Sequence, residues 1–465
     1  MSSATSSATP FDVEATERKL AERCREAVRL ALAAGAQEAE AYATRGRETT
    51  VGMEKGDLQL ARSSSSGALG LRVVLDGRLG FAASNRGDAG ALERLAENAV
   101  GLARIAPPDE HNGLPPSRPL APRLNLYREE LGAFPVERAV EIAGELLQRT
   151  AGADPRVSVD SGKVSSRVGS AAIVSSTGVD AVDTDGMLGF QVFGMAIDGE
   201  DVGGFDVQGG SLRDVDALEP ELDRAARAFL ANVLGNLGVE RAESYQGPVL
   251  FSPEAFQSVC VGPLIAASSS IAVQRGRSYL AGRVGEAVAH ESLNLIDDPS
   301  DTELAGAATF DREGLPCTRF PIVEGGVLRS LLYNGYSARV DGVQSTGHAA
   351  GGTRAVPGIG THAIVVEPGS GGDEQAMLER LGRGLYVQRF SGTTDAASGD
   401  FSGVAKSARW VEGGRIVRSV GETLLSGNSF AALAEDLHLS SERRNLFGSC
   451  RMPWALLSGI SVTAG

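Results

Sequence analysis

The sequence has few of the residues that build covalent or metal-linked frameworks. Its four cysteines, Cys24, Cys260, Cys317 and Cys450, lie far apart, and no C-x-x-C pair occurs. Neither a zinc ribbon nor a dithiol redox motif is therefore supported. Scattered, unpaired cysteines fit a reducing compartment, so we expect the protein to be cytoplasmic.

Long apolar runs and an excess of positive charge are also absent. No run of 18 apolar residues exists, so no membrane span is predicted. Residues 1–12 have neither a basic start nor an apolar core, which indicates a short disordered lead and not a signal peptide. The net charge of −15 argues against a nucleic-acid-binding surface and against docking on anionic lipid.

Catalytic spacing signals are missing as well. The closest two of the five histidines, His348 and His362, are 14 residues apart, so no pair has the spacing of zinc ligands on one helix. His290-Glu291 is the only "HE", and it completes neither HExxH nor HExxxH. No G-x-S-x-G occurs, so a serine hydrolase with a nucleophile elbow is not indicated.

Length and periodicity predict an α+β protein of two domains. The 465 residues divide into an N-terminal domain of β-hairpins and helices, residues 13–236, and a β-rich C-terminal domain with few helices, residues 237–465. Six prolines make residues 106–123 a linker or surface crossing. In the first domain, apolar stripes predict helices over 13–35, 88–105, 135–149 and 211–235, hairpins turning near Gly56-Asp57 and Asp76-Gly77, and a meander over 157–207. The two parts of this domain share an outline, which is weak evidence of an internal repeat.

The second domain carries an ordered series of short motifs. A strand over 247–251 leads into a helix over 253–268, with Ser252 suited to the N-cap and Pro253 to the first helical position. The series continues with DDP (297–299), FDREG (310–314), YSAR (336–339), STG (345–347), SGDFSG (398–403), LLSGN (424–428) and ISVTAG (460–465). Together these motifs resemble the TldD/PmbA proteins, related chains that form a peptidase.

The resemblance implies a division of labour between two chains. The TldD-type chain carries HExxxH on the helix after the first strand of this domain, where the two histidines hold zinc and the glutamate activates water. Here that helix reads SPEAFQSVCVGPLIAAS and contains no histidine. The TldD-type chain also takes a ligand from a cysteine near its C-terminus, but Cys450 falls about three residues late, which favours a buried apolar role.

The resemblance therefore indicates a TldE/PmbA-type, non-catalytic subunit of a heterodimeric zinc peptidase acting on unfolded or leader peptides. We expect no catalytic residue, metal ligand or cofactor in this chain, and a TldD-type HExxxH partner that supplies the zinc. Two alternatives stay open: a family member with changed chemistry in peptide natural-product biosynthesis, and a homodimeric peptide-binding or regulatory protein.

Segments that lie around the cleft in the resembling family supply the candidate substrate contacts. Carboxylates beside Pro or Gly can also serve as ordinary turn residues, and His348 stands where relatives carry an asparagine-like residue. Small residues in STGHAAGG would let a peptide backbone approach closely. The candidates are Asp311, Glu313, Gly314, Ser345, Thr346, Gly347, His348, Asp400 and Ser402.

Overall fold

The first half of the chain forms one long, curved antiparallel sheet. The computed structural model describes residues 10–421, 423–446 and 448–465. In the sheet, strands follow the order β3-β2-β1-β4-β5-β6, and β7 also pairs with β5. The elements are α1 (Val13–Ala33), β1 (Glu38–Glu54), β2 (Asp57–Leu75), β3 (Arg78–Ser84), α2 (Ala89–Ile105), α3 (Glu129–Gly132), α4 (Val136–Arg149), β4 (Val157–Ser175), β5 (Asp180–Asp198), β6 (Asp201–Val202), β7 (Asp206–Leu212) and α5 (Leu218–Gly235).

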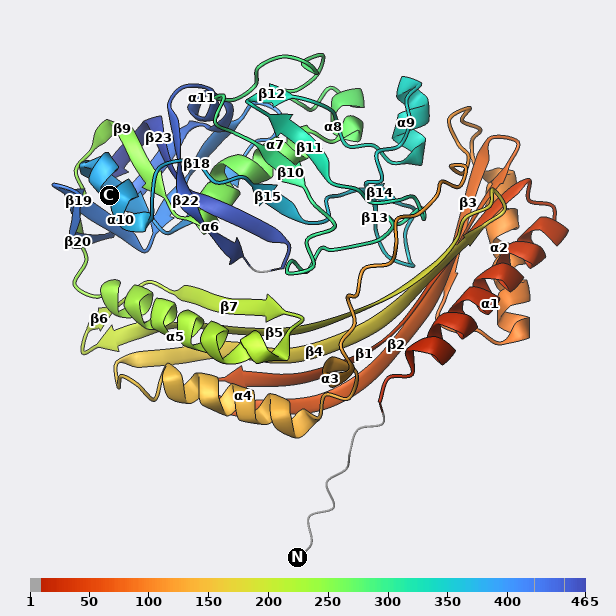
Figure 1. Cartoon of the computed structure of the whole chain (residues 1–465), viewed down its shortest axis with the longest axis horizontal. Helices are drawn as coiled ribbons and strands as arrows, with labels where there is room; N and C mark the ends of the chain where they lie inside the picture. The colour runs from red at the N-terminus through yellow and green to blue at the C-terminus, as the bar shows by residue number, and fades with distance from the viewer. Residues whose placement is uncertain (1–9, 422, 447) are drawn as a thin grey trace, which may run out of the picture.

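Four helices cover one face of this sheet. Alternate side chains of β1 point to that face: Ala41 and Ala43 pack under α1 and α2, whereas Val51 and Met53 pack under α4 and α5. The other face, which carries Tyr42 and Ile173, lies toward the second half of the chain. Figure 1 shows the sheet as a curved band beneath that half, with α1 and α2 at one end and α4 and α5 at the other.

The same succession of elements occurs twice in this sheet. The series α1-β1-β2-β3-α2 is followed by α4-β4-β5-β7-α5, and the sheet order places β1 beside β4 at the centre with β2, β3 and β5, β7 outward on either side. Residues Glu40–Glu54 of β1 pair antiparallel with Ser161–Ser175 of β4. The repeat that the sequence indicated only weakly is therefore present in the topology.

Most of the predicted elements of this half are found, with three differences. Residues 57–75 form the single strand β2, which both predicted hairpins share. β7 extends to Leu212 and Asp214 caps a 3₁₀ turn, so the last helix begins at Leu218 and not at 211. Of the predicted disordered lead, residues 1–9 lie outside the described part, but Phe11 packs on the core and Asp12 caps α1 by accepting a hydrogen bond from the Ala15 N–H.

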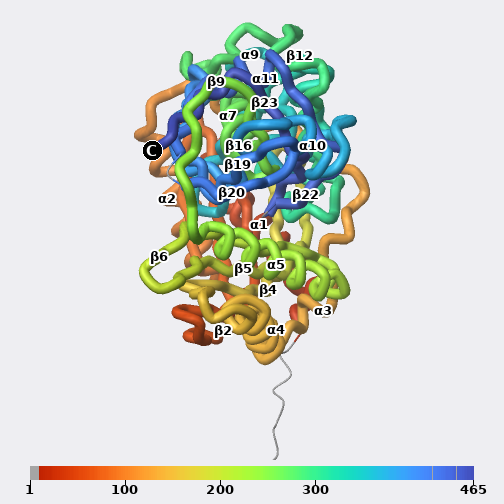
Figure 2. Tube along the Cα trace, turned by 90° about the vertical axis from the view of Figure 1, so that its left-hand side faces the viewer, coloured from red at the N-terminus to blue at the C-terminus, as the bar shows by residue number. Residues whose placement is uncertain are grey.

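The second half is built on a mixed sheet with short helices, so the predicted α+β class is confirmed. Figure 2, turned by 90°, shows this half stacked over the first. β23 is its central strand and pairs with β9, β15, β21 and β22. The strands are β8 (Glu240–Arg241), β9 (Tyr245–Phe251), β10 (Leu295–Asp297), β11 (Phe320–Glu324), β12 (Val327–Leu328), β13 (Ala349–Ala350), β14 (Gly358–Ile359), β15 (Ile364–Val366), β16 (Arg383–Val387), β17 (Arg389–Thr394), β18 (Asp400–Lys406), β19 (Ala408–Glu412), β20 (Arg415–Gly421), β21 (Thr423–Asn428), β22 (Leu437–Leu446) and β23 (Cys450–Ala464).

The helix after β9 is continuous but contains one wider turn. Ser252 caps it by accepting a hydrogen bond from the Ala255 N–H, and Pro253 occupies the first turn, as predicted. The helices of this half are α6 (Pro253–Phe256), a π-turn (Gln257–Val261), α7 (Gly262–Ala267), α8 (Ser270–Gln274), α9 (Gly335–Asp341), α10 (Glu374–Leu381) and α11 (Ser429–Ala434). π-Turns often occur at functional sites.

Candidate functional site

The Asp311 carboxylate organises a turn in the second half. Its Oδ1 accepts hydrogen bonds from the N–H groups of Glu313 and Leu315, at 2.9 and 3.0 Å, and its Oδ2 accepts one from Ala349 at 3.0 Å. The side chain is buried. Burial, followed by the negative charge of Glu313, raises the pKa of Asp311 to about 6. The carboxylate therefore connects the FDREG turn to the STGHAAGG segment.

Glu313 belongs to a buried charge cluster that joins the two halves. Arg72 on β2 binds Glu313 (Nη1–Oε1, 2.9 Å) and also Glu40 on β1, while Arg312 Nη1 lies 2.9 Å from the second oxygen of Glu40. All four side chains are less than 5% exposed. We name these four residues, Glu40, Arg72, Arg312 and Glu313, the interdomain charge cluster.

Opposite charges balance within the interdomain charge cluster. Burial by itself would raise the pKa of Glu40, but Arg72 and Arg312 outweigh it and hold that pKa below its usual value. The Arg312 guanidinium also lies over the Tyr42 ring, 4.0 Å from its centroid.

Gly314, with φ +73°, brings the turn so close to the sheet that an added Cβ would lie 2.3 Å from Val179.

The STGHAAGG segment is held by its own hydrogen bonds. Ser345 Oγ donates to the Tyr333 carbonyl at 3.1 Å, and Thr346 Oγ1 accepts from the Tyr333 N–H at 2.8 Å. Gly347 has φ +76°, and a Cβ there would lie 2.5 Å from the Pro316 carbonyl oxygen. The space that a peptide backbone would need above Gly347 is therefore filled by this chain.

His348 and His362 form a buried polar network with Asp297. Asp297 Oδ2 lies 3.2 Å from His348 Nε2 and accepts a hydrogen bond from the His362 N–H at 2.8 Å. The pKa of Asp297 is lowered: burial opposes this, but His348 and the charge of His362 outweigh burial. His362 Nε2 lies 2.8 Å from the Gly347 carbonyl and 3.3 Å from Cys317 Sγ, a thiol whose pKa burial raises. The sequence did not place His362 or Asp297 among the candidate contacts, because their proximity to His348 arises only in the fold.

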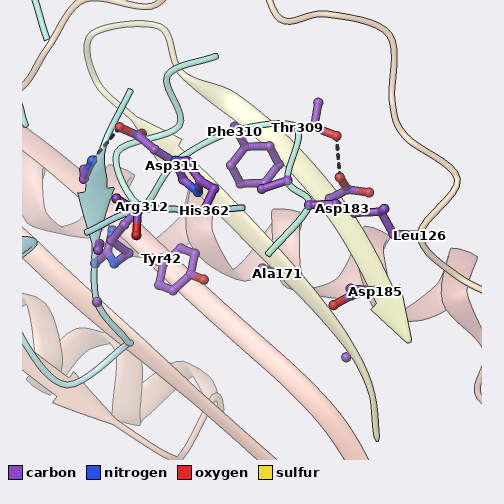
Figure 3. A pocket seen from close by; sticks show the side chains of 17 residues that line it. Tyr42, Leu126, Ala171, Asp183, Asp185, Thr309, Phe310, Asp311, Arg312 and His362 are labelled. Atoms are coloured by element: carbon purple, nitrogen blue, oxygen red, sulfur yellow. Dashed lines mark hydrogen bonds between the residues drawn. The ribbon is translucent and has the colours of Figure 1, made fainter. Parts of the chain in front are cut away.

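A pocket of about 270 Å³ lies between the two halves beside this network. Figure 3 shows Tyr42, Asp183 and Asp185 on the sheet side and Thr309, Phe310, Asp311, Arg312 and His362 on the loop side. Thr309 Oγ1 donates to Asp183 at 2.7 Å across the pocket. Asp185 pairs with Arg213 at 3.0 Å, yet burial raises its pKa. Asp183 and Asp185 are already bonded to residues of this chain. We therefore interpret the pocket as a small polar cavity within the contact between the two halves.

The structure brings most of the predicted candidates together but leaves two apart. Residues 311, 313, 314 and 345–348 are connected by the contacts above, although only Asp311 of the predicted set lines the pocket. Asp400 and Ser402 lie on β18, exposed to solvent, where Asp400 accepts a hydrogen bond from Asn428 Nδ2 at 2.9 Å. Neither residue lines the pocket that Asp311 lines, so a role for Asp400 and Ser402 in binding substrate stays a prediction.

The helix that carries HExxxH in TldD-type chains does not fit zinc here. Its solvent-accessible side has Glu254, Gln257 and Ser258, a carboxylate, an amide and a hydroxyl, which are not the histidine or thiolate set that holds zinc. Cys450 lies at the start of β23, where burial raises the pKa of its thiol to about 11. Among residues 10–421, 423–446 and 448–465, no group of three or more His, Cys, Asp or Glu side chains is arranged to hold a metal ion.

Two family models match the chain and together cover more than half of it. The PmbA/TldA metallopeptidase C-terminal domain matches residues 244–464, and domain 1 of the same family matches residues 39–103. The chain belongs to the PmbA/TldD family. This assignment accounts for both halves of the molecule and confirms the family resemblance of the motifs.

Individual PmbA/TldD relatives match over most of their length. A metalloprotease PmbA homolog from Haemophilus influenzae is 27% identical, covering 91% of this chain and 93% of the relative. The metalloprotease PmbA of Escherichia coli O157:H7 is also 27% identical, over 86% of each chain. The crystal structure of TldE from Thermococcus kodakarensis superposes with a TM-score of 0.86 at 22% identity, covering 95% of this chain and all of that one, and so shares its fold. In the described part of this family member, no helix is both long and apolar enough to cross a membrane.

Proposed function

We propose that this PmbA/TldD chain is the non-catalytic, TldE/PmbA-type subunit of a two-chain zinc peptidase. The observation that carries the proposal is the composition of the helix after β9. Where a TldD-type chain has HExxxH, this helix offers Glu254, Gln257 and Ser258. A partner chain with HExxxH would supply the zinc and the general base, and this chain would order the partner's site and help to hold an unfolded or leader peptide.

A long unpaired sheet edge supports the need for a partner. Within the described part of the chain, β3 pairs with residues 69–75 of β2, so residues 57–68 of β2 have a strand on one side only. Residues 57–67 are all exposed, and Leu58 and Leu60 are 42% and 48% exposed. Isolated proteins usually protect such an edge because it pairs readily with another chain. We infer that this edge, which we name the β2 edge, is covered in the working assembly.

The compartment proposed for this assembly is the cytoplasm. All four cysteines are free thiols, and burial raises the pKa of Cys24 and that of Cys450. Thiols without disulfide partners suit a reducing environment.

Co-purification from the native cells tests the subunit assignment. A tagged copy of this chain should recover, in equal amount, a chain whose sequence contains HExxxH, and the pair should hydrolyse an unfolded peptide. The chain alone should neither hydrolyse that peptide nor retain zinc through dialysis. Recovery of a homo-oligomer alone would support the peptide-binding alternative, and one equivalent of retained zinc with activity would support independent chemistry.

Variants of the β2 edge refine this experiment. Leu58→Lys together with Leu60→Lys should reduce recovery of the partner, because two charges would have to be desolvated in the contact. Leu102→Lys, on α2, is the control, since Leu102 is 46% exposed but lies on a helix. Equal recovery with all variants would remove the β2 edge from the contact without changing the subunit assignment.

A further inference from the structure

A second, larger cleft lies between the two halves, beyond the pocket beside His362. Its volume is about 800 Å³. The first half contributes the end of β7, the start of α5 and residues near Asn125, and the second half contributes residues 302–303, β22 and the start of β23. In Figure 1, β7 and β22 face each other across this gap. We name it the arginine cleft.

The arginine cleft is positively charged in a chain whose net charge is −15. Three carboxylates line it: Asp214, Glu221 and Glu303. They face twice as many arginines, namely Arg128, Arg213, Arg224, Arg443, Arg444 and Arg451. A local excess of guanidinium groups in an acidic protein is the feature that calls for an explanation.

Three of these arginines are already neutralised within the chain. Arg213 binds Asp185 at 3.0 Å and the carbonyls of Thr302 and Leu304. Arg451 binds Asp301 and Glu303 at 2.7 and 2.6 Å, and Arg224 binds Glu221 at 2.9 Å. These contacts build the walls of the arginine cleft.

The other three arginines are paired weakly or not at all with carboxylates of this chain. The Arg443 guanidinium has no hydrogen bond or ion pair with any residue that the structure describes. Arg128 Nη1 donates to two backbone carbonyls at 3.4 and 3.5 Å and to the Asn125 side-chain oxygen at 3.0 Å, but none of these partners is a carboxylate. Arg444 lies 3.6 Å from Glu254 and over the Trp454 ring. Arg443 is exposed, and partial desolvation, followed by the charge of Arg451, lowers its pKa, so an anion placed beside it would relieve an unfavourable arrangement.

Two strand edges border the same cleft. β22 pairs with β23 on one side, and β7 pairs with β5, so within the described residues each has a second edge without a strand. Residues 443–446 of β22 and 210–212 of β7 line the cleft consecutively. Successive side chains of a strand point to opposite faces, so a cleft that lies against one face would contact every second residue. Consecutive lining residues therefore indicate that the cleft runs along the backbone edges of β22 and β7.

We propose that the arginine cleft binds an extended acidic peptide segment, whose main chain adds to the edge of β22 and whose carboxylates pair with Arg128, Arg443 and Arg444. Guanidinium groups bind carboxylates through charge-assisted, often bidentate, hydrogen bonds, and a free strand edge supplies sequence-independent main-chain bonds. This proposal deepens the proposed function by naming a substrate class, and it rests on that function in taking the ligand to be a peptide.

Fluorescence anisotropy with three labelled peptides tests the proposal on the full chain. The probes are alternating Glu-Ala, Gln-Ala and Lys-Ala peptides of equal length. The Glu-Ala peptide should bind roughly tenfold more tightly than the Gln-Ala peptide, and its affinity should fall as salt is raised. The Lys-Ala peptide should not bind. Equal affinity for the Glu-Ala and Gln-Ala peptides would overturn the proposal.

Matched variants locate the binding. Arg443→Gln with Arg444→Gln should weaken Glu-Ala binding about tenfold, one order of magnitude for two charge-assisted contacts. Arg380→Gln with Arg415→Gln removes the same charge from exposed positions on α10 and β20 and should leave binding unchanged. Arg128→Gln alone provides a second reading from the other wall if the double variant unfolds. If the control pair weakens Glu-Ala binding equally, the loss of binding is explained by the change in net charge alone, and the proposal is overturned.

Two further probes separate the remaining explanations. A Glu-Ala peptide with alternate backbone nitrogens methylated should bind more weakly, and unchanged binding would exclude strand addition. A short oligothymidylate that displaces the peptide and binds more tightly would assign the arginine cleft to nucleic acid instead. If the Glu-Ala peptide binds but no HExxxH partner is recovered, the peptide site stands and the subunit assignment fails. If the partner is recovered but the peptide does not bind, the subunit assignment stands and the peptide site fails.

Discussion

The interdomain charge cluster and the arginine cleft both contain arginines between the two halves, but they differ in charge balance and exposure. In the cluster, two carboxylates meet two guanidiniums, and all four side chains are buried. In the arginine cleft, six guanidiniums face three carboxylates, and Arg443 is exposed and unpaired among the described residues. A balanced, buried set stabilises the contact between the halves, whereas an unbalanced, accessible set can bind something else.

The largest expected effect is on the stability of the balanced site. Glu40→Gln should lower the free energy of unfolding by about 3–5 kcal/mol, because Arg72 and Arg312 would stay buried without their shared carboxylate. Denaturant unfolding measures the change. Glu26→Gln, which breaks an exposed pair with Arg29, is the control and should change little. A small effect of Glu40→Gln would mean that water reaches the cluster.

A somewhat smaller loss is expected at Gly347. Gly347→Val should cost about 1–3 kcal/mol, because the residue has φ +76° and its Cβ would lie 2.5 Å from the Pro316 oxygen. Gly352→Val is the matched control, since no atom lies within 4 Å of its added Cβ. Thermal unfolding compares the two variants. A stable Gly347→Val variant with reduced peptide turnover would restore the predicted backbone approach at this glycine.

The pH dependence of stability should show the buried carboxyl of Asp311. Its pKa is about 6 when folded, compared with an ordinary value of 3.8, so between these values the folded chain binds more protons than the unfolded chain. The stability from this group is present below about pH 4 and is lost as pH rises through 6, a change of about 2–3 kcal/mol.

Comparison with Asp311→Asn isolates this contribution, because the other carboxyls titrate in both proteins. Denaturant unfolding at several pH values between 4 and 7.5 should show the stability of the native chain falling relative to that of the variant as pH rises. A constant difference across this range would mean that Asp311 ionises at an ordinary pKa.

The smallest effect on stability is expected in the arginine cleft. Arg443→Gln should leave the midpoint of thermal unfolding unchanged or slightly raised, because it removes a cation placed near Arg451 without breaking an ion pair with any described residue. The same variant should weaken binding of the acidic peptide. A marked loss of stability would show that Arg443 is structural, and the contrast between the two regions would disappear.

The sequence predicted elements better than it predicted contacts. The cap at Ser252, the turn at Asp76-Gly77 and the helix over 89–105 follow from local chemistry that acts within a few residues. The single long strand β2 was not predicted, because its polar run of serines gives no apolar alternation, and the strand is held by backbone pairing with β1. Likewise, the sequence indicated Asp311 and Glu313 as an acidic pair, but their partners Ala349 and Arg72 are 38 and 241 residues away.

By itself, the sequence determined the family, the α+β class and the absence of HExxxH, since each depends on residue order and local periodicity. Only the tertiary structure decided which charged side chains are buried in ion pairs and which stay accessible. Packing against the sheet buried Glu313 with Arg72 and closed the space above Gly347, while the meeting of β7 with β22 gathered arginines from positions 128 to 451 into one cleft. Desolvation and pairing act through space, so the same residue type becomes a structural contact in one place and an accessible binding group in another.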